Sequence, residues 1–103
     1  MFRLVIRIIS KEKFNSKIVI AEPFYLPVKE DMKIWREDLD PKLEVIRKLA
    51  KEFKAPLVPL DNIFIQASKK APMEYWLYDG VHPTPAGIGL IAQAWLKKVL
   101  HQN

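Results

Sequence analysis

The spacing of apolar and polar residues divides the first part of the chain into a helix and a strand. Residues 2–12 carry apolar side chains three and four positions apart, which predicts a helix with Phe2, Val5, Ile6 and Ile9 on one face. Lys17–Ala21 is a nearly continuous apolar run containing β-branched residues, a pattern that is typical of a buried parallel strand. A loop with two prolines follows this strand.

The rest of the chain predicts a helix, a second strand and two more helices. Asp40 and Pro41 supply an N-cap and a first-position proline for a helix that ends before Pro56. Leu57–Leu60 is the second strand, so residues 17–60 form a parallel strand-helix-strand unit. Asp61 is expected to cap a short helix. The last helix spans about residues 85–101, and its predicted apolar face comprises Ile88, Ile91, Ala92, Trp95 and Val99.

Composition limits the chemistry that the chain can perform. With 103 residues, of which 50% are hydrophobic and 28% charged, we expect a single globular domain over residues 1–103. The lack of cysteine excludes disulfides, thiol catalysis and cysteine-ligated metals, and two histidines, His82 and His101, leave little scope for a metal site. The net charge of +5 comes from basic residues spread among acidic ones, and no nucleic-acid-binding module is recognisable, so we expect no nucleic-acid partner.

The apolar start of the chain, Met1–Ile9, does not have the properties of a membrane anchor. Arg3 and Arg7 interrupt it, it is too short to span a bilayer, and no small-residue cleavage site follows. We therefore expect neither a signal peptide nor a membrane partner, and a cytoplasmic location.

The strongest chemical signal is Asp79 and His82, three residues apart on a stiff turn before the last helix. Gly80 permits a tight turn, and Thr84 and Pro85 supply the N-cap and first turn of the helix. An aspartate that binds one imidazole nitrogen fixes the tautomer, so that the other nitrogen can act as a general base. An Asp-x-x-His pair alone also fits an ordinary turn beside a loop histidine. Its position after two strands and before an amphipathic helix indicates descent from proteins that use such a pair, and does not by itself indicate activity.

These residues resemble a known family. Residues 79–84 (Asp-Gly-Val-His-Pro-Thr), followed by Ala86-Gly87 and an apolar helix, are similar to the C-terminal block of the SGNH, or GDSL-type, serine esterases. Residues 17–24 and 57–61 resemble the last two core strands of that family. The resemblance implies a partial flavodoxin-like, three-layer α/β sandwich with two parallel strands and about four helices. It further implies that Asp79 orients His82, that His82 serves as base and then acid, and that no metal or organic cofactor is needed.

The other motifs of that family are missing from this chain. Its Gly-Asp-Ser nucleophile, its glycine loop and its Gly-x-Asn-Asp segment have no counterpart here, and none of Ser10, Ser16 and Ser68 follows a Gly-Asp pair. We therefore expect negligible esterase activity from the chain alone, and hydrolysis of a small acyl ester only if an N-terminal portion completes it. The alternative is a truncated or degenerate relative that acts by self-association or protein binding. In either case the open edge of the Lys17–Ala21 strand is the expected contact.

A weaker resemblance concerns the substrate. The run from Glu22 to Pro27 is similar to bacterial members of the family that look like carbohydrate deacetylases, which favours a small acetyl ester on a sugar. Phe24, Tyr25 and Trp76 are candidates for lining a substrate pocket, and packing in the core is an equally good interpretation of each.

Overall fold

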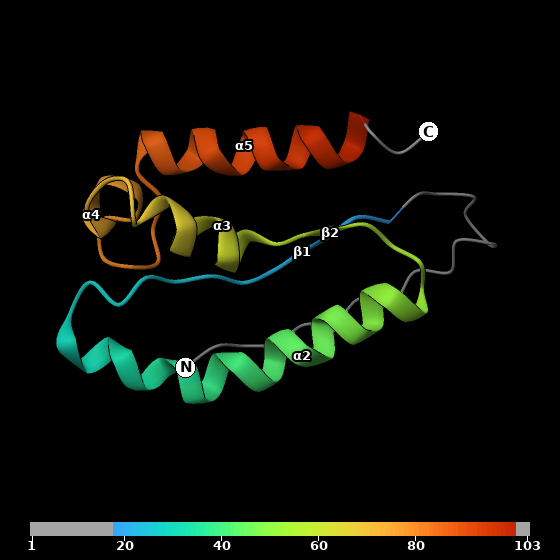
Figure 1. Cartoon of the computed structure of the whole chain (residues 1–103), viewed down its shortest axis with the longest axis horizontal. Coiled ribbons are helices and arrows are strands. Elements are labelled where there is room, and N and C mark those ends of the chain that lie inside the picture. Colours follow the sequence, from blue (N-terminus) through green and yellow to red (C-terminus); the bar gives the residue numbers. More distant parts are fainter. Residues whose placement is uncertain (1–17, 101–103) are drawn as a thin grey trace.

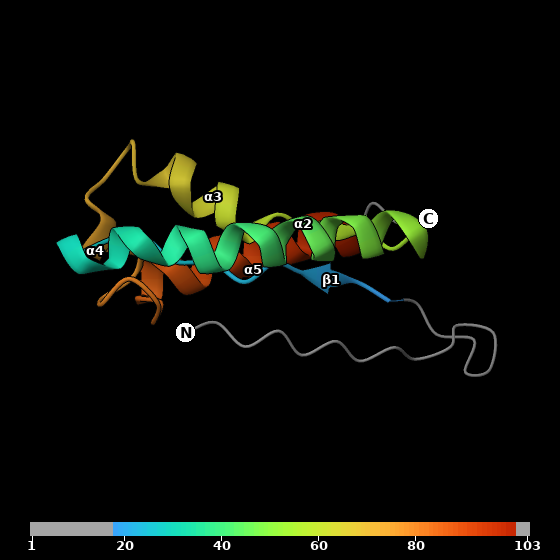
Figure 2. The same cartoon turned by 90° about the horizontal axis from the view of Figure 1, so that it is seen from below.

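Two long helices enclose a small parallel sheet in the computed structural model, which describes residues 18–100. Helix α5 covers one face of the sheet and helix α2 the other (Figure 1), and α2 lies in front of α5 when the molecule is turned by 90° (Figure 2). In chain order the elements are β1 (Ile20–Ala21), the 3₁₀-helix η1 (Glu30–Trp35), α2 (Arg36–Glu52), β2 (Leu57–Val58), α3 (Leu60–Ala67), α4 (Met73–Trp76) and α5 (Pro85–Leu100). The predicted α/β class, with two parallel strands and about four helices, is confirmed.

The sheet is short but has the predicted parallel pairing. Ile20 lies opposite Leu57, and the ladder extends to the Ile20 amide, which donates to the Pro56 carbonyl at 2.9 Å. The strand predicted at Leu57–Leu60 ends two residues early. Pro59 has no amide hydrogen to continue a ladder, and Leu60 is already the first residue of α3. Of the strand predicted at residues 17–21, the described part forms strand only at Ile20 and Ala21, because β2 offers two partners and no more.

Helix α2 begins earlier than its sequence predicts. Asp40 is not its N-cap: the helix starts at Arg36, directly after η1, and Pro41 lies inside it. Pro41 costs the helix one backbone hydrogen bond. The residues before Pro41 are nevertheless held in helix because Leu39 is fully buried in a cluster with Tyr25 and Met32, residues that precede the helix. The end of α2 before Pro56 is as predicted.

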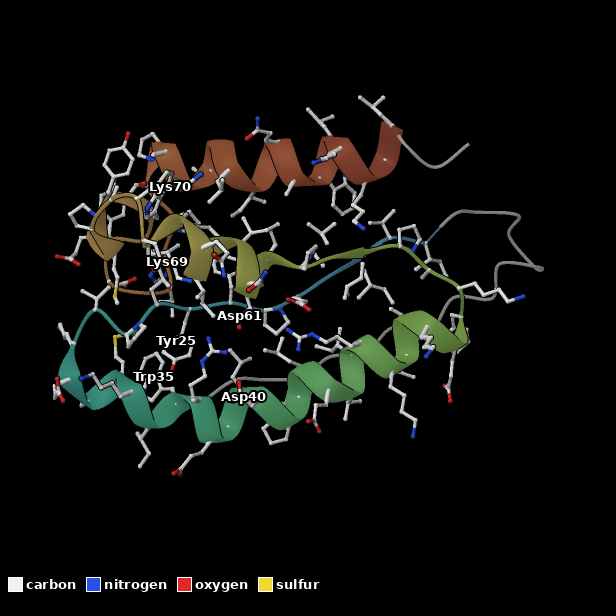
Figure 3. All side chains as sticks on the ribbon, in the orientation of Figure 1. Tyr25, Trp35, Asp40, Asp61, Lys69 and Lys70 are labelled. Carbon is white, nitrogen blue, oxygen red and sulfur yellow. The ribbon has the colours of Figure 1, made fainter. Side chains whose placement is uncertain are left out.

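Asp61 has a different role from the predicted helix cap. Pro59 occupies the N-cap position of α3, no side chain caps the helix, and Asp61 lies in its first turn with 2% of its surface exposed. Its carboxylate accepts two hydrogen bonds from the guanidinium of Arg36, at 2.6 and 2.8 Å. Figure 3 shows Asp61 between α3 and α2, in the same region of the view as Tyr25 and Asp40. Asp61 thus joins α3 to α2.

A second, partly buried ion pair lies beside the first. Glu22, the residue after β1, has a fully buried side chain and accepts a hydrogen bond from Arg47 of α2 at 2.7 Å. Its other oxygen accepts the Asp61 amide at 3.3 Å. Two carboxylates that follow the two strands are thus each paired with an arginine of α2, which holds this helix against the sheet.

The face that α5 turns toward the core is rotated from the predicted one. Leu90 and Ile91 pack against the cluster of Leu26, Phe64 and Leu77, whereas Ile88, Trp95 and Val99 are 40–58% exposed. Gly87 explains the rotation, because a side chain at this position would collide with the carbonyl oxygen of Trp76. Only glycine allows α4 and α5 to approach this closely, and this contact fixes which side of α5 is buried.

This contact predicts opposite effects for the same substitution at two neighbouring glycines. Gly87→Ala is expected to destabilise the fold by about 1–3 kcal/mol because its Cβ meets backbone rather than a flexible side chain. Gly89→Ala, in the same helix with open space around its Cβ, is expected to stabilise it by about 0.5–1 kcal/mol. Thermal unfolding of the two variants measures both effects. Equal shifts in Tm would show that the α4–α5 contact is not a close one.

The helix predicted at residues 2–12 lies outside the described residues. Between residues 18 and 100, no helix combines the length and apolar character that crossing a bilayer requires.

Candidate active site

The candidate site is a tight loop between α4 and α5. Leu77 pairs with Pro83 in an isolated antiparallel bridge. The Tyr78 amide donates to the His82 carbonyl at 2.9 Å, and the Thr84 amide donates to the Trp76 carbonyl at 3.0 Å. These bonds close the five-residue loop 78–82 and place Asp79 and His82 on it. The loop joins α4 to the start of α5, at the left of Figure 1.

Gly80 fastens this loop to the core. Its φ of 93° lies in the region that favours glycine, as the sequence predicts for the turn. Its carbonyl accepts the Leu26 amide at 2.9 Å, and a Cβ on Gly80 would collide with the Leu26 carbonyl and the Met32 side chain. The turn therefore lies directly on the segment that follows β1.

Thr84 fixes the other end of the loop. Its hydroxyl oxygen accepts the Gly87 amide at 3.1 Å, so Thr84 is the predicted N-cap of α5, with Pro85 as the first helical residue. The same hydroxyl donates to the Tyr75 carbonyl of α4 at 2.6 Å. One buried side chain thus caps α5 and ties it to α4.

Asp79 and His82 form the pair that the sequence predicts. Asp79 Oδ2 lies 2.6 Å from His82 Nδ1, and Asp79 Oδ1 accepts the backbone amides of Val81 at 3.0 Å and His82 at 2.8 Å. The His82 side chain is 76% exposed. A carboxylate at Nδ1 makes that nitrogen the hydrogen-bond donor, so Nε2 is the nitrogen that can accept a proton.

The carboxylate of Asp79 is held in its charged form. The backbone hydrogen bond from His82, then that from Val81, and the contact with the His82 ring lower the pKa of Asp79 well below its usual range. Asp79 is therefore ionised at any pH at which His82 could act as a base. This is the charge state that supports an imidazolium during proton transfer.

The lowered pKa predicts the acid stability of the turn. A group with a depressed pKa in the folded state contributes stability above its unfolded pKa, and this is lost as the pH falls through the folded pKa. We therefore expect Asp79 to remain ionised at about pH 3, where an ordinary aspartate is mostly protonated. Carbon-13 NMR of the Asp79 carboxyl measures this directly. A free peptide of residues 77–84 is the control, and identical titrations of peptide and protein would contradict the hydrogen-bonded turn.

The three aromatic candidates all make packing contacts. Phe24 stacks on Phe64 with ring centroids 4.6 Å apart, and the Trp76 indole donates to the Ala67 carbonyl at 3.0 Å. Tyr25 is fully buried next to Trp35. None of these contacts brings the three rings to Asp79 or His82. A substrate contact for each of the three stays a prediction, and Tyr25 is fully buried among the described residues.

One exposed aromatic residue at the site, Tyr78, was not predicted from the sequence. Tyr78 lies opposite His82 across the loop and is 62% exposed. The order Leu77, Tyr78, Asp79 indicates this exposure. Side chains of an extended segment alternate between faces, so a buried Leu77 places Tyr78 on the exposed face.

Among residues 18–100, no serine is placed as a nucleophile and no group of acidic or histidine side chains could hold a metal ion. Ser68, the serine of this range, is the C-cap of α3, and its hydroxyl donates to the Ile65 carbonyl at 2.6 Å. Ser10 and Ser16 lie outside the described residues.

A hollow of about 330 Å³ between α2 and α3 is a separate feature. Arg36, Asp40, Arg47 and Asp61 contribute to its lining, and these side chains take part in ion pairs within α2, between α2 and α3, and between α2 and Glu22 after β1. The charged groups that line this hollow therefore have a structural role in the packing of α2.

Comparison with known proteins identifies the fold. No protein-family model and no curated protein matches the chain. A crystal structure from Parabacteroides merdae ATCC 43184, described as a GDSL-like lipase, matches with a TM-score of 0.76 and 41% identity. The match covers 85% of this chain and 42% of that one, so the chain spans less than half of the relative's length. This similarity to part of a GDSL-like lipase supports the resemblance seen in the sequence, and the chain has part of the α/β fold of that protein.

Proposed function

We propose that this chain supplies the Asp-His pair of a GDSL-type serine ester hydrolase whose remaining catalytic groups come from a complementary N-terminal portion. One observation carries the proposal. Asp79 Oδ2 lies 2.6 Å from His82 Nδ1 on a loop held by Gly80 and Thr84, with the imidazole exposed. The chain alone, which has no Gly-Asp-Ser motif, is proposed to be inactive.

The chemistry is a two-step acyl transfer. His82 Nε2 takes the proton of the complementary serine hydroxyl as its oxygen attacks the ester carbonyl. The bond between the carbonyl carbon and the alcohol oxygen then breaks, and His82 returns the proton to the leaving alcohol. Water repeats the sequence on the acyl-serine, with His82 again as base, and releases the carboxylic acid. Asp79 stabilises the imidazolium in both steps.

The proposed substrate is a small acetyl ester of a carbohydrate. Support comes from the run Glu22–Pro27, which resembles that of carbohydrate deacetylases. In the structure this run leads directly to the site, since Leu26 donates its amide to the Gly80 carbonyl.

The proposed contact with the complementary portion involves α5 and β1. Over the described residues, β1 pairs with β2 along one edge, which leaves its other edge for a further strand. Apolar side chains of α5 are 40–70% exposed, and these are Ile88, Trp95, Leu96, Val99 and Leu100. The relative is more than twice the length of the matched part, so its unmatched part is long enough to cover both surfaces.

The same surfaces support a second candidate function. Exposed apolar residues on α5 would also drive self-association of a non-enzymatic relative. Light scattering separates the two: the enzymatic proposal requires a one-to-one complex when the complementary portion is added, whereas the second candidate requires a homo-oligomer that persists in its presence.

Complementation tests the proposed function. The chain is mixed with the part of the Parabacteroides merdae protein that it does not match, and hydrolysis of an aryl acetate is followed. We expect no turnover from either polypeptide alone and turnover from the mixture. A one-to-one complex without turnover would contradict the proposal.

A further inference from the structure

The bridge beside the catalytic loop places Tyr78 and His82 on one surface. Leu77 and Pro83 pair directly, so Tyr78 and His82 are the next opposed positions, joined by the 2.9 Å bond from the Tyr78 amide to the His82 carbonyl. Successive side chains of an extended segment alternate between faces. Leu77 is fully buried, whereas Tyr78 is 62% exposed, as this alternation requires. Side chains at opposed positions have Cβ atoms about 4.5–5.5 Å apart.

The backbone that carries these two side chains is firmly held. Asp79 accepts the Val81 and His82 amides, and the Gly80 carbonyl accepts the Leu26 amide. A tyrosine on such a backbone has few rotamers to lose when it binds a ligand. The ring of Tyr78 is therefore carried by a preorganised backbone, and tyrosine has only two side-chain torsions to fix on binding.

The position of Tyr78 determines which part of a substrate it meets. His82 must come within about 3 Å of the alcohol oxygen of the ester in order to return its proton. The alcohol therefore lies beside the residue that is opposed to His82. A pyranose ring has an apolar C–H face, and the aromatic ring of tyrosine offers an apolar face against which it can pack.

From this geometry we infer that Tyr78 is a platform that binds the pyranose ring of the ester's alcohol beside His82. The inference rests on the proposed function and names the residue that selects the alcohol. Tyr75 is the matched comparison: it is exposed to a similar extent, 56%, but it belongs to α4 and its ring packs edge-on against Trp76 at 4.8 Å.

The test is an NMR titration of the complex with two acetate esters, without any requirement for turnover. Methyl tetra-O-acetyl-glucopyranoside carries the ring, and glycerol triacetate carries the same acetyl group without it. Tyr78→Leu is expected to weaken binding of the pyranoside by about fivefold or more and that of the triacetate by less than about twofold. Tyr78→Phe and Tyr75→Leu are each expected to change neither affinity by more than about twofold.

The outcomes separate this inference from the proposed function. Pyranoside binding that depends on Tyr78, in a complex that hydrolyses no ester, supports the platform and contradicts the hydrolase. Equal losses for both esters in Tyr78→Leu, no loss for the pyranoside, or no binding of the pyranoside at all would overturn the platform. This holds even if the complex hydrolyses both esters.

Discussion

Replacing His82 by alanine is expected to lower the ester-hydrolysis rate of the complemented enzyme by about 10⁴-fold or more. His82 is the exposed base of the site, and its Nδ1 is already bound to Asp79 at 2.6 Å. Without the imidazole, no group on this loop can take the serine proton or return it to the alcohol. Initial rates of aryl acetate hydrolysis at saturating complementary portion measure the effect.

Asp79→Asn is expected to cause a loss of the same order, for a different reason. An amide can still accept the backbone amides of Val81 and His82, so the loop keeps its shape. Its NH₂ group, however, would donate to His82 Nδ1 and favour the tautomer in which Nε2 carries the hydrogen. Glu74→Gln, an exposed change on the neighbouring α4, is the control and should leave the rate unchanged. A His82→Ala rate within tenfold of the parent would mean that the pair is not catalytic.

Removing Asp61 is expected to have the largest effect on stability. The Asp61 side chain is 4% exposed and binds both terminal nitrogens of Arg36, so Asp61→Ala leaves a partly buried guanidinium with the more exposed Asp40 as its remaining ion-pair partner among the described residues. Breaking a buried pair by removing one partner costs about 3–5 kcal/mol. Because Arg36 is partly exposed and keeps Asp40, we expect about 2–3 kcal/mol.

Urea unfolding, followed by circular dichroism, measures this loss. The exposed pair of Glu30 and Lys33 in η1 is the matched control, and Glu30→Ala should leave the unfolding midpoint unchanged. If Asp61→Ala unfolds at the same urea concentration as the parent chain, then the Arg36–Asp61 pair does not hold α3 to α2.

The features that the sequence predicted correctly depend on neighbouring residues. Thr84 caps α5 from three positions before Gly87, and Asp79 reaches Val81 and His82 within the same turn. Gly80 takes the positive φ that the turn needs. Hydrogen bonds over so few residues are largely set by local chain geometry, so spacing along the sequence was sufficient to find them.

The features that were predicted wrongly depend on contacts between distant residues. Asp40 and Pro41 form a good local helix start, yet α2 begins at Arg36 because Leu39 is buried against Tyr25 and Met32, which precede the helix. Asp61 is of a residue type that is common at helix N-caps, but it is instead a buried ion-pair partner. In each case a tertiary contact outweighs a local preference worth about 1 kcal/mol.

The sequence by itself determined the turn, its Asp-His pair, the cap of α5 and the order of the elements around them. Only the tertiary structure decided which face of α5 is buried and that Tyr25 belongs to the core. The physical reason is the reach of the interactions. Backbone turns and caps are completed within a few residues, whereas burial depends on which elements of the fold come to lie against each other.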